Sequence, residues 1–158
     1  MEKRKRSAPK KRVAFVCTGN TCRSVMAEYI LRRTLKKLGR DDVVAESYGL
    51  KVRKGDGIHP LAVAALRSLG IVAKSHPARV LTRKVADRAA IIVCMTEEHK
   101  RVVGKPDAVS FRDLTGLDVR DPFGGGDKDY EAVAKQIENG MPAVLAALDD
   151  LSKTESRP

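Results

Sequence analysis

Aromatic residues, cysteines and long apolar runs are all scarce in this 158-residue sequence. Aromatic side chains make up 4% of the chain, and tryptophan is absent. No apolar run approaches the roughly 20 residues that cross a bilayer. No apolar segment follows the basic N-terminus, as one would in a secretory signal. We therefore expect one domain that is not inserted in a membrane and that works in the cytoplasm.

The chain has only three cysteines, Cys17, Cys22 and Cys94. An odd number without the spacing of a disulfide framework is typical of proteins in a reducing compartment. Cys94 ends an apolar run, and we expect it to pack in the core. The cysteine and histidine residues do not have the spacing of zinc ligands, so we expect no metal site.

The charge of the chain is unevenly distributed. Residues 1–12 hold seven lysines and arginines against one glutamate, a net charge of +6, which leaves +5 of the total of +11 for the rest. We expect residues 1–12 to be a basic, disordered tail, residues 13–151 to be one domain, and residues 152–158 to be a polar C-terminal tail. The basic tail can contact nucleic acid, anionic lipid or an acidic partner, or it can be a solvated arm without a specific role.

Apolar runs typical of strands alternate with helical patterns along the chain. Strands are expected at residues 13–16, 43–45, 89–94 and 108–111, and helices at residues 24–38, 60–69, 83–88, 97–103 and 129–151. Residues 74–82 and 113–128 are expected to be irregular, and Pro142 is expected to kink the last helix. This alternation indicates an α/β fold with a doubly wound parallel sheet.

The stretch that carries chemistry lies between the first strand and the first helix. Cys17 opens a polar loop and Arg23 closes it, with five residues between them. Successive backbone N–H groups of such a loop can surround an anion, helped by the positive end of the helix that follows. The Arg23 guanidinium matches two phosphate oxygens. The same positive field stabilises a thiolate, so we expect Cys17 to be a nucleophile that attacks phosphorus.

The residue types inside this loop suit a tight turn before a helix. Gly19 permits backbone conformations that are closed to other residues. Asn20 tolerates a left-handed conformation. Ser24 is a favourable residue at a helix N-cap. The phosphate-binding loop is completed by the remaining positions, Thr18, Thr21 and Cys22.

The stretch from Cys17 to Ser24, with Met26-Ala27-Glu28 behind it, resembles the phosphate-binding loop of the low-molecular-weight protein tyrosine phosphatase family. The resemblance covers residues 12–151. It implies a three-layer α/β/α sandwich with a four-stranded parallel sheet, so that residues 13–151 form a single phosphatase domain. It also implies hydrolysis of phosphorylated proteins to inorganic phosphate through a phosphocysteine on Cys17, without a cofactor. We expect the protein to be a monomer.

The family has an Asp-Pro dipeptide whose aspartate is the general acid, and the resemblance transfers that role to Asp121. Such an acid protonates the leaving group and then, as a carboxylate, activates water. Asp118 lies nearby and is a second candidate. Ser24 is expected to donate its hydroxyl to Cys17. The resemblance further implies that Asn20, Ser47 and His76 brace the loop by hydrogen bonds, although His76 can equally be a surface histidine.

Cys22 has two interpretations. It can fill space within the loop, or, as the resemblance implies, it can form a reversible disulfide with Cys17 under oxidation. Thioredoxin-coupled arsenate reductases share the same loop but need two further cysteines downstream, and only Cys94 is available here. We therefore reject a reductase. Val25 stands where the family commonly has proline, a departure that removes no catalytic group.

The substrate depends on the residues around the loop. Tyrosine-directed members usually have a bulky aliphatic residue at the position of Thr21 and an aromatic wall after Asp-Pro. Thr21 and Phe123-Gly124-Gly125 are instead similar to the bacterial protein arginine phosphatase branch, so protein phosphoarginine is the favoured substrate. The alternatives are a tyrosine phosphatase that tolerates Thr21, and a non-catalytic module that binds phosphate or nucleic acid. The presence of both a nucleophile and an acid argues against the second alternative.

Overall fold

The computed structural model describes residues 8–155 and contains a four-stranded parallel sheet in the order β2-β1-β3-β4. The strands are β1 (Lys11–Cys17), β2 (Val43–Gly49), β3 (Ile91–Cys94) and β4 (Val109–Ser110). The helices are α1 (Arg23–Leu38), α2 (Pro60–Ser68), α3 (Arg83–Arg88), α4 (Glu97–Val103), α5 (Phe111–Thr115) and α6 (Asp127–Glu155). The expected α/β fold is confirmed.

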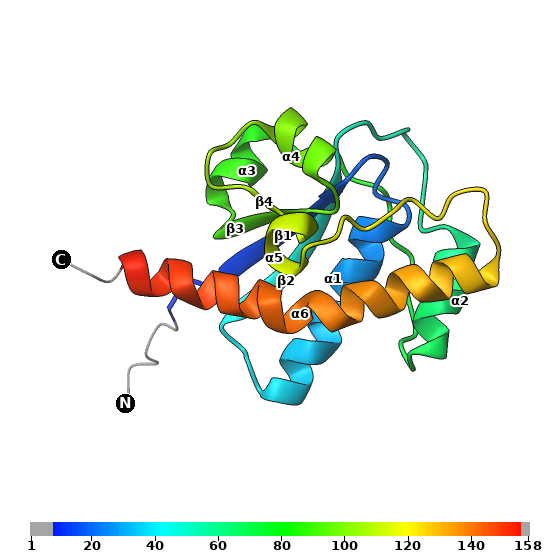
Figure 1. Ribbon diagram of the computed structural model, residues 1–158, viewed down its shortest axis with the longest axis horizontal. Helices are drawn as coiled ribbons and strands as arrows, with labels where there is room; N and C mark the ends of the chain where they lie inside the picture. Colours follow the sequence, from blue (N-terminus) through cyan, green and yellow to red (C-terminus); the bar gives the residue numbers. More distant parts are fainter. Residues whose placement is uncertain (1–7, 156–158) are drawn as a thin grey trace, which may run out of the picture.

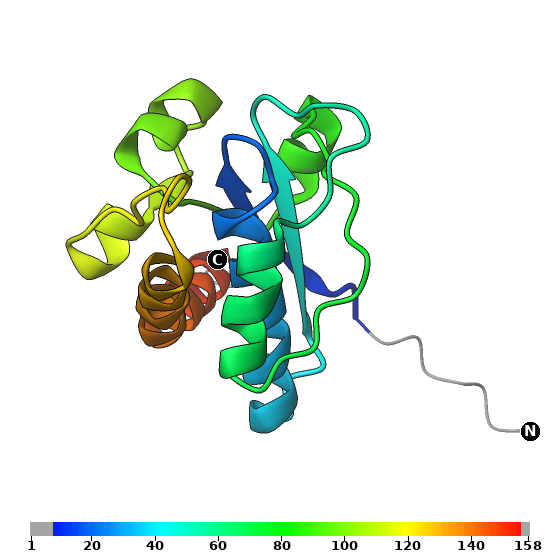
Figure 2. The same ribbon diagram turned by 90° about the vertical axis from the view of Figure 1, so that its right-hand side faces the viewer.

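Helices cover both faces of the sheet (Figures 1 and 2). On one face, α1 packs against β1 and β2, and α6 and α2 pack against α1. On the other face, α3 and α4 contribute Ala86 and Val103 to a second, smaller apolar cluster. Because side chains alternate along a strand, Phe15 enters the first cluster and Val16 the second. The two clusters make the sheet the central layer of a three-layer sandwich.

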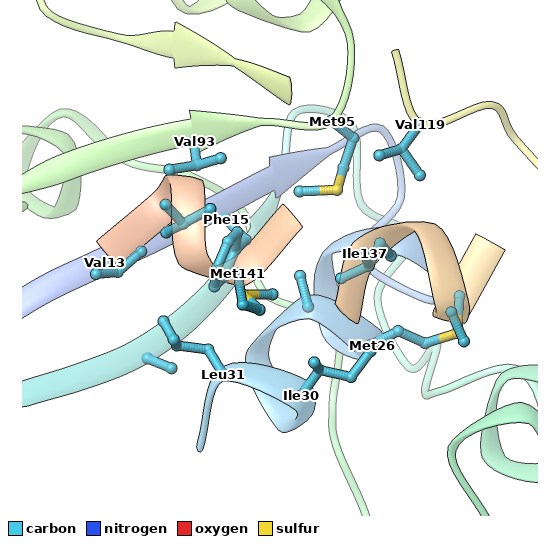
Figure 3. Packing of buried hydrophobic residues seen from close by; sticks show 14 of the residues in the cluster. Val13, Phe15, Met26, Ile30, Leu31, Val93, Met95, Val119, Ile137 and Met141 are labelled. Atoms are coloured by element: carbon cyan, nitrogen blue, oxygen red, sulfur yellow. The ribbon is translucent and has the colours of Figure 1, made fainter. Parts of the chain in front are cut away.

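The larger cluster fills the space between β1, α1 and α6 (Figure 3). Phe15, Ile30 and Met141 are among its members and are at most 1% exposed. Burying each such side chain contributes roughly 1.5–3 kcal/mol. This packing holds the carboxyl end of β1 and the first turn of α1 in a fixed relation, and the predicted loop lies between them.

Several boundaries differ from those expected; β2, for example, runs to Gly49 and not to residue 45. β1 begins at Lys11, which pairs with Val43, so the strand includes the last two residues assigned to the basic tail. Residues 1–7 lie outside the described residues. α6 begins at Asp127 and runs through Pro142 to Glu155, so residues 152–155 belong to the helix. The kink at Pro142 stays a prediction. No helix within the described part of the chain is long and apolar enough to cross a membrane.

One helix was not expected. Residues 108–111 were predicted to be a strand followed by a loop, but β4 ends at Ser110 and α5 begins at Phe111. The reason is a capping box, in which Ser110 accepts from the backbone N–H of Asp113 while the Asp113 side chain accepts from that of Ser110. Phe111 then packs against Gly140 of α6, where an added Cβ would lie 2.5 Å from its ring.

Candidate active site

The predicted loop connects the carboxyl end of β1 to the first turn of α1. Cys17 is the last residue of β1, and Arg23 is the first residue of α1. Between them, Asn20 has a φ of 56°, the left-handed conformation that the sequence analysis expected asparagine to tolerate. Both ends of the loop line the same pocket, which has a volume of about 170 Å³.

Donors from outside occupy the carbonyl groups of the loop. The backbone N–H of Lys51 donates to the carbonyl of Thr18, and that of His59 donates to the carbonyl of Thr21, both at 2.9 Å. Within residues 8–155, the backbone N–H groups of residues 18–22 have no hydrogen-bond acceptor. A loop with its carbonyl groups held in this way can direct its N–H groups at an anion.

Ser24 does not cap the helix, contrary to our expectation. α1 begins one residue earlier, and Cys22 occupies the N-cap position without a side-chain capping bond. The Ser24 side chain is fully buried, with Oγ 2.9 Å from Cys17 Sγ and 2.8 Å from Asn20 Nδ2. Because Asn20 Nδ2 is only a donor, Ser24 Oγ accepts from it and keeps its own proton for the sulfur. A hydroxyl that donates to sulfur stabilises the thiolate.

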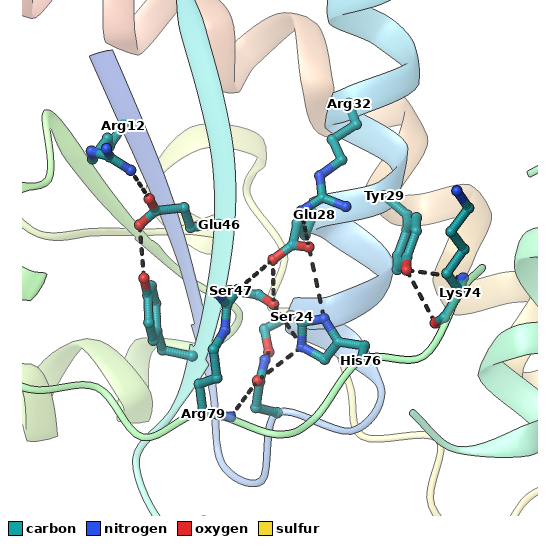
Figure 4. Close-up of polar contacts among 12 residues, drawn as sticks. Arg12, Ser24, Glu28, Tyr29, Arg32, Glu46, Ser47, Lys74, His76 and Arg79 are labelled. Carbon is teal, nitrogen blue, oxygen red and sulfur yellow. Dashed lines mark hydrogen bonds and ion pairs between the residues drawn. The ribbon is translucent and has the colours of Figure 1, made fainter. Parts of the chain in front are cut away.

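Behind the loop, Asn20 is held by further hydrogen bonds, and Figure 4 labels its partners His76 and Arg79. Its Oδ1 accepts from the backbone N–H of Arg79 at 2.9 Å and lies 3.1 Å from His76 Nε2. Because an amide oxygen only accepts, His76 carries its proton on Nε2. Ser47 Oγ lies 3.5 Å from the same nitrogen. The three residues expected to brace the loop are therefore in one network, and His76 is buried rather than on the surface.

Glu28 anchors this network from the second turn of α1 and is 1% exposed. One carboxylate oxygen accepts from Ser47 Oγ and from the Arg79 guanidinium, each at 3.0 Å. The other oxygen pairs with Arg32 at 2.6 Å. Burial raises the pKa of Glu28, and Arg32, Ser47 and Arg79 offset part of that rise. The two arginines compensate a carboxylate that would be costly to bury alone.

Arg23 is buried, and its guanidinium is held in a fixed position. Nη1 donates to the carbonyl of Val119 at 3.0 Å, and Nη2 lies 3.8 Å from Asp121 Oδ2. Both partners belong to the loop that connects α5 to α6. That loop thus contacts the Arg23 end of the phosphate-binding loop and brings a carboxylate to the pocket.

Asp121 stands at the mouth of the pocket with a side chain that is 57% exposed. Its Oδ1 accepts from the backbone N–H of Phe123 at 3.0 Å, which orients the carboxylate. Phe123 is 76% exposed. The pocket is lined by Cys17, Thr18, Gly19, Thr21, Cys22, Arg23, Asp121 and Phe123. A sulfur, a guanidinium and a carboxylate therefore surround a space of the size that a phosphoryl group needs.

Asp118, the second candidate for the acid, is engaged elsewhere. Its Oδ1 accepts from the backbone N–H of Glu97 at 3.0 Å, at the start of α4. Its Oδ2 pairs with Arg112 at 3.1 Å. Asp118 does not line the pocket. Its two oxygens hold structural partners, and we retain Asp121 as the acid.

The three cysteines are free thiols in different environments. Cys22 lines the pocket, and its Sγ lies 3.8 Å from the hydroxyls of Thr21 and Tyr130. Burial raises the pKa of the Cys22 thiol. Cys94 is fully buried at the end of β3, where burial raises its pKa to about 12. A disulfide between Cys17 and Cys22 stays a prediction.

Three residues near the site were not identified from the sequence. Arg79 contacts Asn20 and Glu28, Tyr130 contacts Cys22, and His99 Nε2 lies 2.9 Å from Thr18 Oγ1. Only His99 had a usable signal, because it follows β3 closely and the carboxyl ends of neighbouring parallel strands meet at one edge of a sheet. Between residues 8 and 155, no group of three or more histidine, cysteine, aspartate or glutamate side chains is placed to hold a metal ion.

Gly49 ends β2 where the loop passes closest to the sheet. A Cβ at this position would lie 2.7 Å from the carbonyl oxygen of Thr18 and 3.0 Å from the backbone nitrogen of Asn20. We expect Gly49→Ala to displace the loop and to lower kcat/KM for an aryl phosphate by about 10²-fold, as misplacement by 1 Å can do. Steady-state kinetics measure this effect.

Gly126→Ala is the matched control, because no atom lies within 4 Å of the Cβ that it would add. We expect this variant to keep the kcat/KM of the parent protein. Urea unfolding of both variants distinguishes a displaced loop from a general loss of stability. Overpacking typically lowers the free energy of unfolding by roughly 1–3 kcal/mol. A fully active Gly49→Ala protein would contradict the close approach of loop and strand.

Comparison with known proteins gives matches over almost the whole chain. The model of one family, described as "Low molecular weight phosphotyrosine protein phosphatase", matches residues 12–154. A protein-arginine-phosphatase of Bacillus subtilis is 33% identical over 136 residues, which cover 80% of this chain and 89% of the relative. A low molecular weight protein-tyrosine-phosphatase of Streptomyces coelicolor is 32% identical over 153 residues, which cover 87% and 93%.

Solved structures agree. A mutant of YwlE from Bacillus subtilis superposes with a TM-score of 0.81 at 29% identity, covering 89% of this chain and 99% of that one. A second structure, of the YwlE arginine phosphatase with a phosphorylated active-site serine, has a TM-score of 0.80 at 29% identity and covers 90% and 96%. The family match, at residues 12–154, includes both the loop and the segment that carries Asp121.

Proposed function

Because this chain belongs to the low molecular weight phosphotyrosine protein phosphatase family, we propose that it hydrolyses phosphoarginine in proteins. The coarser activity follows from the family, since the protein is a cysteine-dependent hydrolase of phosphorylated proteins. The observation that carries the finer proposal is that Thr21, a residue with a hydroxyl, lines the same pocket as Cys17, Arg23 and Asp121.

In the first step, the Cys17 thiolate attacks phosphorus in line with the bond that breaks. The Ser24 hydroxyl, 2.9 Å from the sulfur, favours the thiolate form. Asp121 gives its proton to the leaving nitrogen, so that arginine departs as its guanidinium cation and not as neutral guanidine, which is a strong base. The product of this step is a phosphocysteine.

Arg23 and the backbone N–H groups of residues 18–22 hold the equatorial oxygens of the phosphoryl group. Charge is spread over these oxygens in the transition state, and donors fixed in advance stabilise it most effectively. The Val119 carbonyl holds one nitrogen of the guanidinium, which leaves the others for the phosphate. In the second step, Asp121 accepts a proton from water as the water attacks the phosphocysteine, and inorganic phosphate leaves.

The pocket wall supports a polar leaving group. Thr21 offers an oxygen beside the reacting centre, where a bulky aliphatic side chain would offer only apolar contact. A guanidinium carries several N–H donors, and both the Thr21 hydroxyl and the Asp121 carboxylate can accept from them. Phe123 is mostly exposed and does not enclose the pocket as a complete aromatic wall would. Relatives named protein-arginine-phosphatase, at 33% and 34% identity, support the same choice.

Phosphotyrosine is the second candidate substrate. Relatives named for tyrosine phosphatase activity have almost the same identity, 32% in Streptomyces coelicolor and 33% in pig. The exposed ring of Phe123 at the mouth of the pocket can also pack against a phenyl group. These sequence identities do not distinguish a phosphoarginine from a phosphotyrosine substrate, so the rates on the two substrates must be compared.

We expect the parent protein to have a kcat/KM for a phosphoarginine peptide at least about tenfold above that for a phosphotyrosine peptide of the same sequence. Thr21→Ile removes the hydroxyl and adds apolar bulk, and should shift this ratio about tenfold toward phosphotyrosine. Thr21→Ser retains the hydroxyl and is the matched control. If the parent prefers phosphotyrosine and Thr21→Ile leaves the ratio unchanged, the arginine assignment is wrong.

A further inference from the structure

A second threonine lines the pocket, and its hydroxyl is held from outside the loop. Thr18 directly follows Cys17 and lines the pocket. Its Oγ1 lies 2.9 Å from Nε2 of His99, which belongs to the first turn of α4. The histidine is 7% exposed, so this contact is shielded from solvent on the His99 side.

The backbone of α4 is itself anchored, which fixes the imidazole ring. The backbone N–H of His99 donates to Thr96 Oγ1 at 3.1 Å, and that of Glu97 donates to Asp118 Oδ1 at 3.0 Å. Thr96 comes two residues after the end of β3, which pairs with β1 next to the loop. The sheet therefore determines the distance between His99 and Thr18.

His99 occupies a place that does not favour a charged ring. Burial, followed by the positive charge of Arg23, lowers the pKa of His99 to about 4, although Asp118 and Asp121 act in the opposite direction. The ring is thus neutral at pH 7. Its Nδ1 has no hydrogen-bond partner within the described residues. An apolar side chain at position 99 would fill the same space and would leave no buried nitrogen unpaired. What a histidine offers here, and an apolar residue does not, is the hydrogen bond with Thr18.

The chemistry of this hydrogen bond leaves Thr18 able to accept another. A neutral imidazole has one N–H donor and one acceptor nitrogen, and a hydroxyl has one donor and two lone pairs. If Nε2–H donates to Thr18 Oγ1, one lone pair of the oxygen stays available. If Nε2 accepts the hydroxyl proton instead, both lone pairs stay available. In either tautomer, Thr18 Oγ1 keeps at least one lone pair for a further donor.

We propose that Thr18, positioned by His99, is a second substrate-selecting residue that accepts a hydrogen bond from the guanidinium of phosphoarginine. The inference rests on the proposed function and deepens it. The ring of phosphotyrosine carries no N–H donor, so it gains nothing from this oxygen. With Thr21, two threonines of the same loop line the pocket.

The test measures kcat/KM for matched phosphoarginine and phosphotyrosine peptides with four variants. We expect Thr18→Val to lower the ratio of the two values about tenfold, since the lost bond involves a charged donor. Thr18→Ser keeps the hydroxyl and should keep the ratio within about threefold of the parent. We expect His99→Leu to lower the ratio, and His99→Gln to restore it, because an amide can also bond to the hydroxyl.

A purely structural role for either residue would lower both rates equally and would not be rescued by glutamine. Equal losses on the two peptides therefore overturn the inference. Thermal unfolding identifies any variant that does not fold. If Thr18→Val does not fold, the ratio of the two kcat/KM values in the two His99 variants tests the proposal. A parent that prefers phosphoarginine, with a ratio that no variant changes, overturns this inference alone. A parent that prefers phosphotyrosine overturns the proposed function and this inference with it.

Discussion

Replacement of Cys17 by serine is expected to lower turnover by roughly 10³-fold or more, because the nucleophile acts as a unit with the groups around it. The N–H groups of the loop and the Arg23 guanidinium can stabilise a thiolate. A serine hydroxyl ionises far less readily in the same field. The neighbouring Ser24 is a donor to the sulfur and not a base that could activate the new hydroxyl. Initial rates with an aryl phosphate and with a phosphoarginine peptide measure the loss.

Cys94→Ala is the matched control for Cys17→Ser. Cys94 is fully buried at the end of β3 and does not line the pocket, so its loss affects packing and not chemistry. We expect this variant to retain turnover. A Cys17→Ser protein that hydrolysed an aryl phosphate at the full rate would eliminate the phosphocysteine mechanism. A parent protein that bound phosphorylated peptides but turned none of them over would instead support a binding module.

Covalent trapping offers a second measurement on Cys17→Ser. A related arginine phosphatase has been solved with a phosphorylated active-site serine. If Cys17 is the nucleophile here, a serine in its place can take up the phosphoryl group and release it slowly, since a serine alkoxide is a poorer leaving group than a thiolate. Intact-mass measurement after incubation with a phosphoarginine peptide should then show one added phosphate. Cys17→Ala should show none.

The central part of this site could be predicted because its residues lie close together in the sequence. Cys17 and Ser24 are seven residues apart, and the strand, turn and helix between them follow from local residue types. The same holds for the left-handed Asn20, whose φ of 56° agrees with the expectation. Local chemistry was misleading at the start of α1, because Ser24 suits an N-cap but its hydroxyl is buried against the sulfur. Tertiary contact decided between two uses of one hydroxyl.

The contacts that sequence reasoning missed join distant segments. His99 reaches Thr18 because β3 pairs directly with β1, and this strand order places α4 beside the loop. Nothing in the local pattern specifies that order. The contact between Val119 and Arg23 similarly depends on the path of the loop after α5, a helix that was itself missed because its first residue, Phe111, continues an apolar run. Strand order and loop path are tertiary properties, and a single sequence reports them weakly.

The second large expected effect is the loss of kcat/KM when Asp121, the proposed general acid, is replaced. We expect Asp121→Asn to lower kcat/KM for a substrate with a poor leaving group by about 10²–10⁴-fold, the usual contribution of a general acid. Asparagine keeps the size of the side chain and can still accept from the backbone N–H of Phe123, so the loop should keep its position. The variant loses the proton donor of the first step, the base of the second step and the charge that lies 3.8 Å from Arg23. Kinetics with a series of aryl phosphates measure the effect, and the loss should shrink as the leaving phenol becomes more acidic.

Asp118→Asn is the matched control for Asp121→Asn, because Asp118 is a nearby carboxylate with structural partners. Its Oδ1 can still accept from Glu97, and it loses only the ion pair with Arg112, whose side chain is 58% exposed. An exposed pair of this kind contributes little to stability, so we expect the dependence on the leaving group to stay that of the parent. If Asp118→Asn produced the steep dependence and Asp121→Asn did not, the two carboxylates would have to exchange roles. In that case the proton would come from Asp118, which lies beside the start of α4, and not from the mouth of the pocket, and the geometry around Arg23 would no longer explain the first step.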